Sequence, residues 1–396
     1  MGIQHLLSKP EKHYLLERIL TVIVGVILCL TVTACGISPR VMAQDRMFLP
    51  LSVQFLGEYQ LPKTDYKDTP VGGLSAITYD RTINRYYVLS DDRSQKAPAR
   101  FYTMNINIYG DNPQINSIAI EDVTFLTGAD GNQYKAGSID PEGIALSPRN
   151  TLYISSEGAT IEKIPPFVAE FQKTGKLISP VELPSRYIPD KDKEKPGRGV
   201  QDNRGFEPLT LGITSTLKDD PFRLFTATEN ALIQDNPRKN PDTDRRVRML
   251  HYVISPIGQP VLVSENLYLI DESPSSQYNG LVELLALERE GYFLSLERTF
   301  GLSGFGVKLF QVVNASSTDT SKIETLPADL ASLQVRSLEK RLLLDLEDLG
   351  IDLDNLEGMT LGPRFPDGSR SLILVSDDNF QKNQINQFLL FRLKNL

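Results

Sequence analysis

The chain of 396 residues is acidic, with a formal net charge of −8, and 23% of its residues are charged. Such a chain is a poor binder of nucleic acid, because phosphate contacts require clustered Lys and Arg, so we expect no nucleic-acid partner. Both cysteines, Cys29 and Cys35, lie near the N-terminus. Beyond them, disulfides, thiol nucleophiles and cysteine-ligated zinc are excluded.

The N-terminal segment has the features of an export signal. Three basic residues precede an apolar stretch over residues 19–33, and the small residues of "VTACG" then lead to Cys35. A short apolar region followed by small residues before a cysteine is typical of a lipoprotein signal peptide. We therefore predict a signal peptide over residues 1–35 and a lipid on Cys35.

Residues 36–48 are expected to form a tether to the body of the protein, residues 49–396. An uncleaved transmembrane anchor is the alternative, since the apolar stretch is close to the lower limit of about 17 residues for a membrane span. In both cases we expect an exported protein, held at a bacterial membrane and facing the periplasm or the cell surface.

Beyond the tether, short runs rich in Val, Ile, Leu, Tyr and Phe alternate with turn residues, which indicates many β-strands. A short helix is expected only near residues 328–333. Five strand–turn–strand segments can be aligned as repeats, at residues 73–92, 140–158, 205–230, 281–298 and 355–378. Repeats about 70 residues apart, each with room for four strands, are typical of propeller blades.

The predicted fold is an all-β, single β-propeller with five blades, and a six-bladed ring is the alternative. The last repeat is followed by only one more strand-sized run, at residues 386–393. We expect the N-terminal run at residues 51–61 to supply the missing strand of the last blade, which would close the ring and remove its open edges.

Acidic residues flank the repeated hairpins. The first strand begins with an acid in four repeats, whereas Ser75 takes this place in the first one; the acids are Glu142, Glu207, Glu283 and Glu357. The second strands end on Asp91, Glu157, Glu229, Glu297 and Asp377. Antiparallel pairing places the start of one strand beside the end of the next. We therefore expect these carboxylates to converge at one mouth of the ring.

Carboxylates that lie close together raise each other's pKa and need a counter-charge. Oxygen ligands without Cys or His suit calcium or magnesium, so we predict a site for Ca²⁺ or another divalent cation. The alternative is structural: each acid accepts hydrogen bonds from backbone N–H groups where two blades meet.

Two long loops, at residues 182–205 and 229–248, are expected at the same mouth. Arg93 and Arg204 lie on these or equivalent loops, and the planar fork of arginine suits phosphate. We therefore expect a small anionic ligand, possibly phosphorylated. His251, the only histidine beyond the signal peptide, lies within an apolar strand. A Ser-His-Asp triad would need it beside a serine at a mouth, so we do not expect one.

The motifs "GGLSAITYD", "DPEGIAL", "NRGFEPLTL" and "NLEGMTLGP" resemble those of the phytase-like family, which is labelled "esterase-like activity of phytase". The resemblance covers nearly the whole body of the chain. It implies hydrolysis of phosphoric or other esters, by analogy with the six-bladed β-propeller phytases, which use calcium ions, carboxylates and basic side chains on one face.

Together, the repeat and the resemblance predict a membrane-anchored hydrolase of phosphate esters that depends on a divalent cation. The candidate catalytic residues are Glu142, Glu207 and Glu357. The candidate metal ligands are Asp91, Glu157, Glu229, Glu297 and Asp377. The candidate phosphate-binding residues are Arg93 and Arg204. The alternative is a non-catalytic propeller that binds a ligand or a protein and whose acids are structural.

Overall fold

The chain divides into two compact units, residues 1–47 and 48–396, and the second contains every sheet that is described. The computed structural model describes residues 47–110, 112–190, 197–212, 215, 217–236, 245–272, 276–302 and 304–396. No helix within these ranges is long and apolar enough to cross a membrane. The predicted signal peptide, Cys35 and residues 36–46 lie outside the described residues.

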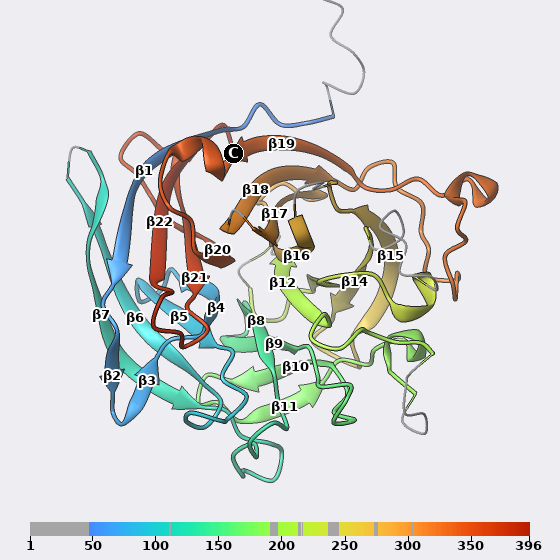
Figure 1. The fold of residues 1–396 in the computed structure, drawn as a ribbon, viewed down its shortest axis with the longest axis horizontal. Coiled ribbons are helices and arrows are strands. Elements are labelled where there is room, and N and C mark those ends of the chain that lie inside the picture. The colour runs from blue at the N-terminus through green and yellow to red at the C-terminus, as the bar shows by residue number, and fades with distance from the viewer. Residues whose placement is uncertain are drawn as a thin grey trace, which may run out of the picture. The chain divides into compact units, whose positions relative to one another are not determined.

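The unit 48–396 is built from five four-stranded antiparallel sheets, which Figure 1 shows around a common centre as the blades of a propeller. Blade 1 comprises β4 (Leu74–Asp80), β5 (Arg85–Ser90), β6 (Arg100–Tyr109) and β7 (Gln114–Phe125). Blade 2 comprises β8 (Pro141–Leu146), β9 (Thr151–Ser156), β10 (Phe167–Gln172) and β11 (Leu177–Pro180). Blade 3 comprises β12 (Phe206–Gly212), β13 (Phe222–Thr228), β14 (Arg246–Ile254) and β15 (Val261–Leu269).

Blade 4 comprises β16 (Ser276–Ala286), β17 (Tyr292–Gly301), β18 (Gly304–Val313) and β19 (Glu339–Asp345). Blade 5 comprises β20 (Asn355–Arg364), β21 (Arg370–Asp377), β22 (Asn386–Lys394) and, from the start of the unit, β1 (Ser52–Leu61). The prediction of an all-β propeller with five blades is confirmed, and the six-bladed alternative is wrong.

The ring is closed by β1, which pairs antiparallel with β22 from Ser52 opposite Lys394 to Leu61 opposite Asn386. This pairing completes the last blade in the way expected for residues 51–61. It joins the two ends of the unit in one sheet, so that neither end of the ring is left as an open edge. At the centre, β4, β8, β12, β16 and β20 contact one another in this order, and β20 contacts β4.

The apolar cores lie between neighbouring blades. In one cluster, Ile77 and Val88 of blade 1 pack with Ile373 and Val375 of blade 5. Side chains alternate between the two faces of each strand, and both faces of a blade are covered by its neighbours, so the strands are apolar on both sides.

The remaining elements are short. They are the hairpin of β2 (Thr64–Tyr66) and β3 (Thr69–Val71) and the 3₁₀ helices η1 (Ser185–Tyr187), η2 (Ile233–Asp235), η3 (Leu330–Leu333) and η4 (Leu346–Leu349). The helix η3 lies where the sequence indicated one, and the Asp329 side chain caps its N-terminus by accepting a hydrogen bond from the Ala331 N–H.

Candidate functional site

A β-bulge interrupts the pairing of the first two strands at the same place in every blade. The pairing skips one residue of the first strand in four blades and two residues, Glu207 and Pro208, in blade 3. The residues at this position are Ser75, Glu142, Glu207, Val282 and Glu357, in the order of the blades. A bulge redirects a side chain, and here it presents the acids of blades 2, 3 and 5 to the same cavity.

Glu283 of blade 4 lies one residue beyond the bulge and is therefore not a member of this ring. Its buried carboxylate accepts hydrogen bonds from the backbone N–H groups of Leu284 at 2.9 Å and Leu209 at 3.3 Å. The expectation that Glu283 lies at the mouth is wrong, because the bulged residue of blade 4 is Val282 and Glu283 corresponds in register to Gly143 of blade 2. For this acid the structural alternative holds.

The same register decides which residues end the second strands. Asn355 lies opposite Asp377, and Gly280 lies opposite Arg298. The residues at this repeat position are Asp91, Glu157, Glu229, Arg298 and Asp377. Blade 4 therefore places a cation where each of the other blades places an acid.

Glu297, one residue earlier, lies outside the cavity. Its carboxylate accepts hydrogen bonds from the Tyr268 hydroxyl at 2.6 Å and the Asp271 N–H at 2.8 Å, and it forms an ion pair with Lys340. These contacts satisfy the side chain within blade 4 and its connection to blade 3. We therefore leave Glu297 out of the candidate metal site.

The other predicted acids come together around a cavity of about 660 Å³. They are joined there by Asp140, and the full set of lining acids is Asp91, Asp140, Glu142, Glu157, Glu207, Glu229, Glu357 and Asp377. Blades 1, 2, 3 and 5 all contribute, so a site at the centre of the ring is assembled from distant parts of the sequence.

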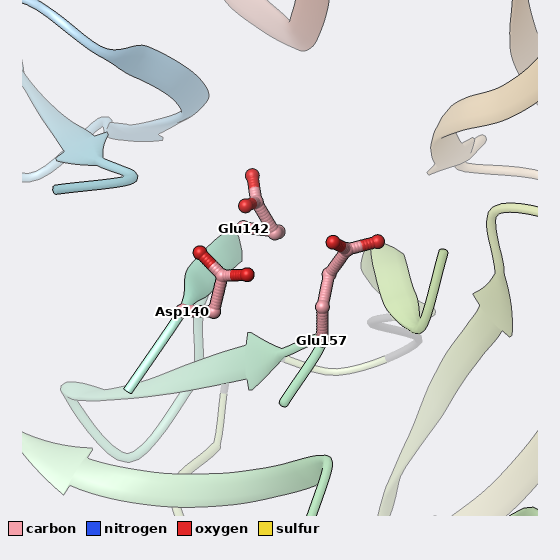
Figure 2. A group of neighbouring side chains, drawn as sticks. All are labelled: Asp140, Glu142 and Glu157. Atoms are coloured by element: carbon pink, nitrogen blue, oxygen red, sulfur yellow. The ribbon is translucent and has the colours of Figure 1, made fainter. Parts of the chain in front are cut away.

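Three overlapping groups of these acids have carboxylate oxygens within 4.8 Å of one another. The groups are Asp140–Glu142–Glu157, Glu142–Glu207–Glu357 and Glu157–Glu207–Glu229. Figure 2 shows the first group, in which residues at the start of β8 and the end of β9 approach one another. Because each group shares an acid with another, the carboxylates form one continuous cluster.

Burial and mutual repulsion perturb the acids of the cluster. Burial raises the pKa of Asp140 to about 6, of Asp377 to about 7 and of Glu357 to about 8. Burial, followed by repulsion from neighbouring carboxylates, raises the pKa values of Asp91, Glu142, Glu157 and Glu207 well above their usual range. The cluster therefore resists full ionisation unless positive charge is supplied.

Three oxygens of the cluster have no hydrogen-bond partner among the described residues, and one of them, Asp140 Oδ2, lies 2.5 Å from Arg93 Nη2 in an ion pair. The other two are Glu157 Oε1 and Glu207 Oε2, on residues that are only 4% and 6% exposed. Unsatisfied buried acceptors are rare because they lose their hydration without compensation. An all-oxygen set with free lone pairs fits a hard divalent cation such as Ca²⁺.

Arg298 supplies part of the positive charge. Its Nη2 lies 2.9 Å from Glu229 Oε1, and its Nη1 contacts Glu357 and the Asn355 side chain. The guanidinium group thus bridges acids of blades 3 and 5 from its position in blade 4. The acids of blade 2 and Glu207 are outside the reach of these contacts. Arg93 pairs with Asp140, so among the described residues the acids on that side without an arginine contact are Glu142, Glu157 and Glu207.

The chain was also compared with known proteins. The family model described as phytase-like, esterase-like activity of phytase, matches residues 69–380. The chain belongs to the phytase-like family. No curated protein sequence matches it.

Solved structures with a similar arrangement of strands include two glycoside hydrolases and a lactonase. The catalytic domain of the Coprinopsis cinerea GH62 α-L-arabinofuranosidase is 12% identical, with a TM-score of 0.41 over 87% of this chain and 97% of that chain. A thermostable family-43 glycoside hydrolase is 10% identical, with a TM-score of 0.41 over 85% and 91% of the two chains. The periplasmic gluconolactonase of Pseudomonas aeruginosa is 11% identical, with a TM-score of 0.34 over 86% and 95%. Similarity at this level says nothing about the substrate of the phytase-like chain.

The two arginines expected to bind phosphate occupy different positions. Arg93 lines the cavity, where its Nε lies 2.8 Å from Asp140 Oδ1 and its Nη2 contacts Asn203. Arg204 is not among the lining residues, and its guanidinium carbon lies 4.6 Å from the ring centroid of Tyr278, which does line the cavity. Arg93 is thus placed at the candidate site, and Arg204 supports one of its walls.

Sequence reasoning missed several lining residues of this phytase-like site. Asp140 and Asn355 hold the same place, two residues before Glu142 and Glu357, in the motifs "DPEG" and "NLEG". That shared position is a signal that a comparison of the repeats could have used. Arg298 could be expected from the sequence to pair with repeat acids, and it does pair with Glu229 and Glu357. Its place in the repeat could not be expected, because Glu297 beside it matches the other repeats by charge and only the strand register separates the two.

Proposed function

We propose that this phytase-like protein is an exported hydrolase of phosphate esters that depends on a divalent cation and uses the acidic cavity. One observation carries the proposal: a cluster of buried carboxylates, interlinked within 4.8 Å, includes Glu157 and Glu207 oxygens that no described protein group satisfies. A cation would supply the missing charge.

Asp140, Glu142 and Glu157 would hold a cation on the blade 2 side, and Glu207 and Glu229 would extend the ligand set toward blade 3. Calcium suits them best, because it accepts six to eight oxygen ligands in flexible geometry. Bound there, it would neutralise a phosphate group and polarise its ester. Without it, a cavity lined by eight acids and two arginines would repel an anion.

The protein groups around the substrate would divide the acid–base work. Glu357, whose pKa is raised to about 8, would retain a proton at neutral pH and could donate it to the departing alcohol oxygen. Glu142 or Glu207 would accept a proton from the attacking water. Arg93, which is 30% exposed at the rim, would donate hydrogen bonds to phosphate oxygens from the side not used by Asp140.

The test is hydrolysis of 4-nitrophenyl phosphate by the full-length protein in millimolar Ca²⁺ and in EDTA. We expect turnover only with the cation, and a loss of at least about 100-fold in the Glu207→Gln variant, which removes both a candidate general base and a candidate cation ligand. Glu283→Gln is the matched control, because Glu283 is equally buried but accepts only backbone hydrogen bonds. Equal turnover in EDTA and Ca²⁺ would overturn the proposal.

The alternative of a non-catalytic binding propeller gives a different result. It predicts that Ca²⁺ stabilises the fold while no ester is hydrolysed under any condition. In that case the acid cluster would serve to display a cation to an anionic partner.

We propose further that the protein is anchored to a bacterial membrane through a lipid on Cys35. The Cys35→Ala variant should then move from the membrane fraction to the soluble exported fraction. If the variant stayed with the membrane to the same extent as the unchanged protein, an uncleaved N-terminal anchor would replace the lipid in this account.

A further inference from the structure

Blade 4 differs from the other blades at two repeat positions that face the cavity. It has Val282 where blades 2, 3 and 5 carry an acid, and Arg298 where each of the other blades carries an acid. In their place it contributes three aromatic side chains to the lining, Tyr278, Phe300 and Phe305. The cavity therefore has an anionic side on blades 1, 2, 3 and 5 and an aromatic side on blade 4.

The three aromatic residues form one row across the blade. Tyr278 lies opposite Phe300 in the β16–β17 pair, and Phe300 lies opposite Phe305 in the β17–β18 pair. Directly opposed residues of antiparallel strands project from the same face of a sheet. Arg298, two residues before Phe300, shares that face by strand alternation, which places the row beside the charged cluster.

Contacts with neighbouring side chains hold the three aromatic rings in place, and the row still lines the cavity. The rings of Phe300 and Phe305 lie 4.8 Å apart at a tilt of 40°, and the guanidinium groups of Arg204 and Arg298 lie over the Tyr278 ring. Phe300 is nevertheless 48% exposed. A preorganised and exposed aromatic surface that borders an ion-lined cavity has the composition of a ligand subsite.

The size of the cavity leaves room for more than a phosphate group. Its volume of about 660 Å³ falls in the range of sites that enclose a complete small organic molecule. If an anionic group occupies the acidic side through a cation, the rest of the same molecule faces blade 4. There it would meet the aromatic row, beside Arg298 and away from the carboxylates.

We propose that Tyr278, Phe300 and Phe305 form a subsite for a planar, apolar group, so that the substrate is an aryl phosphate ester. This inference rests on the proposed function, since it assigns the alcohol part of the same substrate. It excludes highly charged polyphosphates as the preferred ligands, because their additional anionic groups would lie against aromatic rings.

The test compares two phosphonates that cannot be hydrolysed, phenylphosphonate and methylphosphonate, by calorimetric titration into the full-length protein in millimolar Ca²⁺. We expect phenylphosphonate to bind about threefold to tenfold more tightly, the gain typical of an aromatic contact. Phe300→Ala should abolish this difference and leave methylphosphonate binding unchanged. Ile257→Ala, which truncates an apolar side chain that is 87% exposed and does not line the cavity, should leave both affinities unchanged.

Equal affinities of the two phosphonates for the unchanged protein would overturn the subsite while leaving the proposed function standing. A preference for phenylphosphonate that survives in both Phe300→Ala and Phe305→Ala would overturn it as well. If glucose 6-phosphate lost more affinity in Phe300→Ala than phenylphosphonate, the row would bind a sugar face, and the aryl assignment would fall.

A neutral probe separates this subsite from the proposed function. If neither phosphonate binds but 2-naphthol binds with an affinity that falls in Phe300→Ala, the aromatic subsite is supported and the phosphate function is not. If 2-naphthol binding is the same in Phe300→Ala and in the unchanged protein, the subsite is overturned irrespective of any hydrolysis.

Discussion

Replacing Arg298 by Met should destabilise the propeller, because it removes the only arginine that bridges the acids of blades 3 and 5 within the described cavity. Arg298 forms ion pairs with Glu229 and Glu357, and all three side chains are at most 12% exposed. Above pH 8, where Glu357 is ionised, removing one partner of this buried ion pair leaves an uncompensated charge and costs about 3–5 kcal/mol. For a domain of this size the melting temperature should fall by roughly 4–7 °C.

The loss should depend on pH in a defined direction. Burial raises the pKa of Glu357 to about 8, and Arg298 opposes this rise, so the pKa of Glu357 should be higher still in the variant. An acid with a raised folded-state pKa contributes its stability fully below the unfolded value of 4.5 and loses it as the pH rises through the folded value. The destabilisation should therefore be smallest near pH 5 and reach its full size above pH 8.

The assay is scanning calorimetry in EDTA, since the chain contains no tryptophan to report unfolding. The matched control is Arg364→Met, because Arg364 and its partner Glu288 are 49% and 53% exposed. An exposed pair contributes at most about 1 kcal/mol, so this variant should differ little from the unchanged protein. The reasoning is refuted if the Arg298→Met and Arg364→Met variants have the same melting temperature at pH 9. It is also refuted if the loss of stability in Arg298→Met is the same at pH 5 and pH 9.

Three further predictions concern the acid cluster and its neighbours. In EDTA, the free energy of unfolding should fall between pH 5 and pH 8, because the pKa values of Asp377 and Glu357 are raised to about 7 and about 8; denaturant titrations that show a rise would contradict this. Glu283→Ala should lower the free energy of unfolding by about 1–3 kcal/mol, because two buried backbone N–H groups lose their acceptor. The stabilisation by Ca²⁺ should stay unchanged, and its loss would show that Glu283 belongs to the site. Gly205→Ala would place a Cβ atom 2.3 Å from the backbone oxygen of Glu157. Calorimetry should therefore show a loss of about 1–3 kcal/mol in the free energy of unfolding and a smaller rise of the melting temperature with Ca²⁺. An unaltered rise would mean that Glu157 is not a ligand.

The architecture could be predicted because its signal is repeated. Each repeat carries a hairpin of apolar runs between turn residues. The strand at residues 51–61 precedes the first repeat, and the last repeat lacks one strand. The pairing of β1 with β22 confirmed that count. Strand number and order depend on patterns that recur in every blade, so errors in a single repeat do not disturb them.

The site could be predicted less completely, because it depends on register at single residues. In "LVELLALEREGYFLSLER" both Glu283 and Glu297 match the repeat acids by type, but the strand pairing places Val282 and Arg298 at the two cavity positions, one residue away from each acid. A shift of one residue reverses the face on which a side chain lies. The positions of Arg298 and of the aromatic row of blade 4 follow from the same register, and the repeat pattern of the sequence does not indicate them.

The most direct test of the cation site is calorimetric unfolding of the full-length protein in EDTA and then in millimolar Ca²⁺. A ligand at 100 times its dissociation constant stabilises the folded state by about 2.7 kcal/mol, so the melting temperature should rise by several degrees. The rise should persist in Glu283→Gln and disappear in Glu142→Gln and Glu207→Gln. If Ca²⁺, Mg²⁺ and Mn²⁺ all leave the melting temperature unchanged, or if the two cavity variants respond like the control, the acidic cavity is not a cation site.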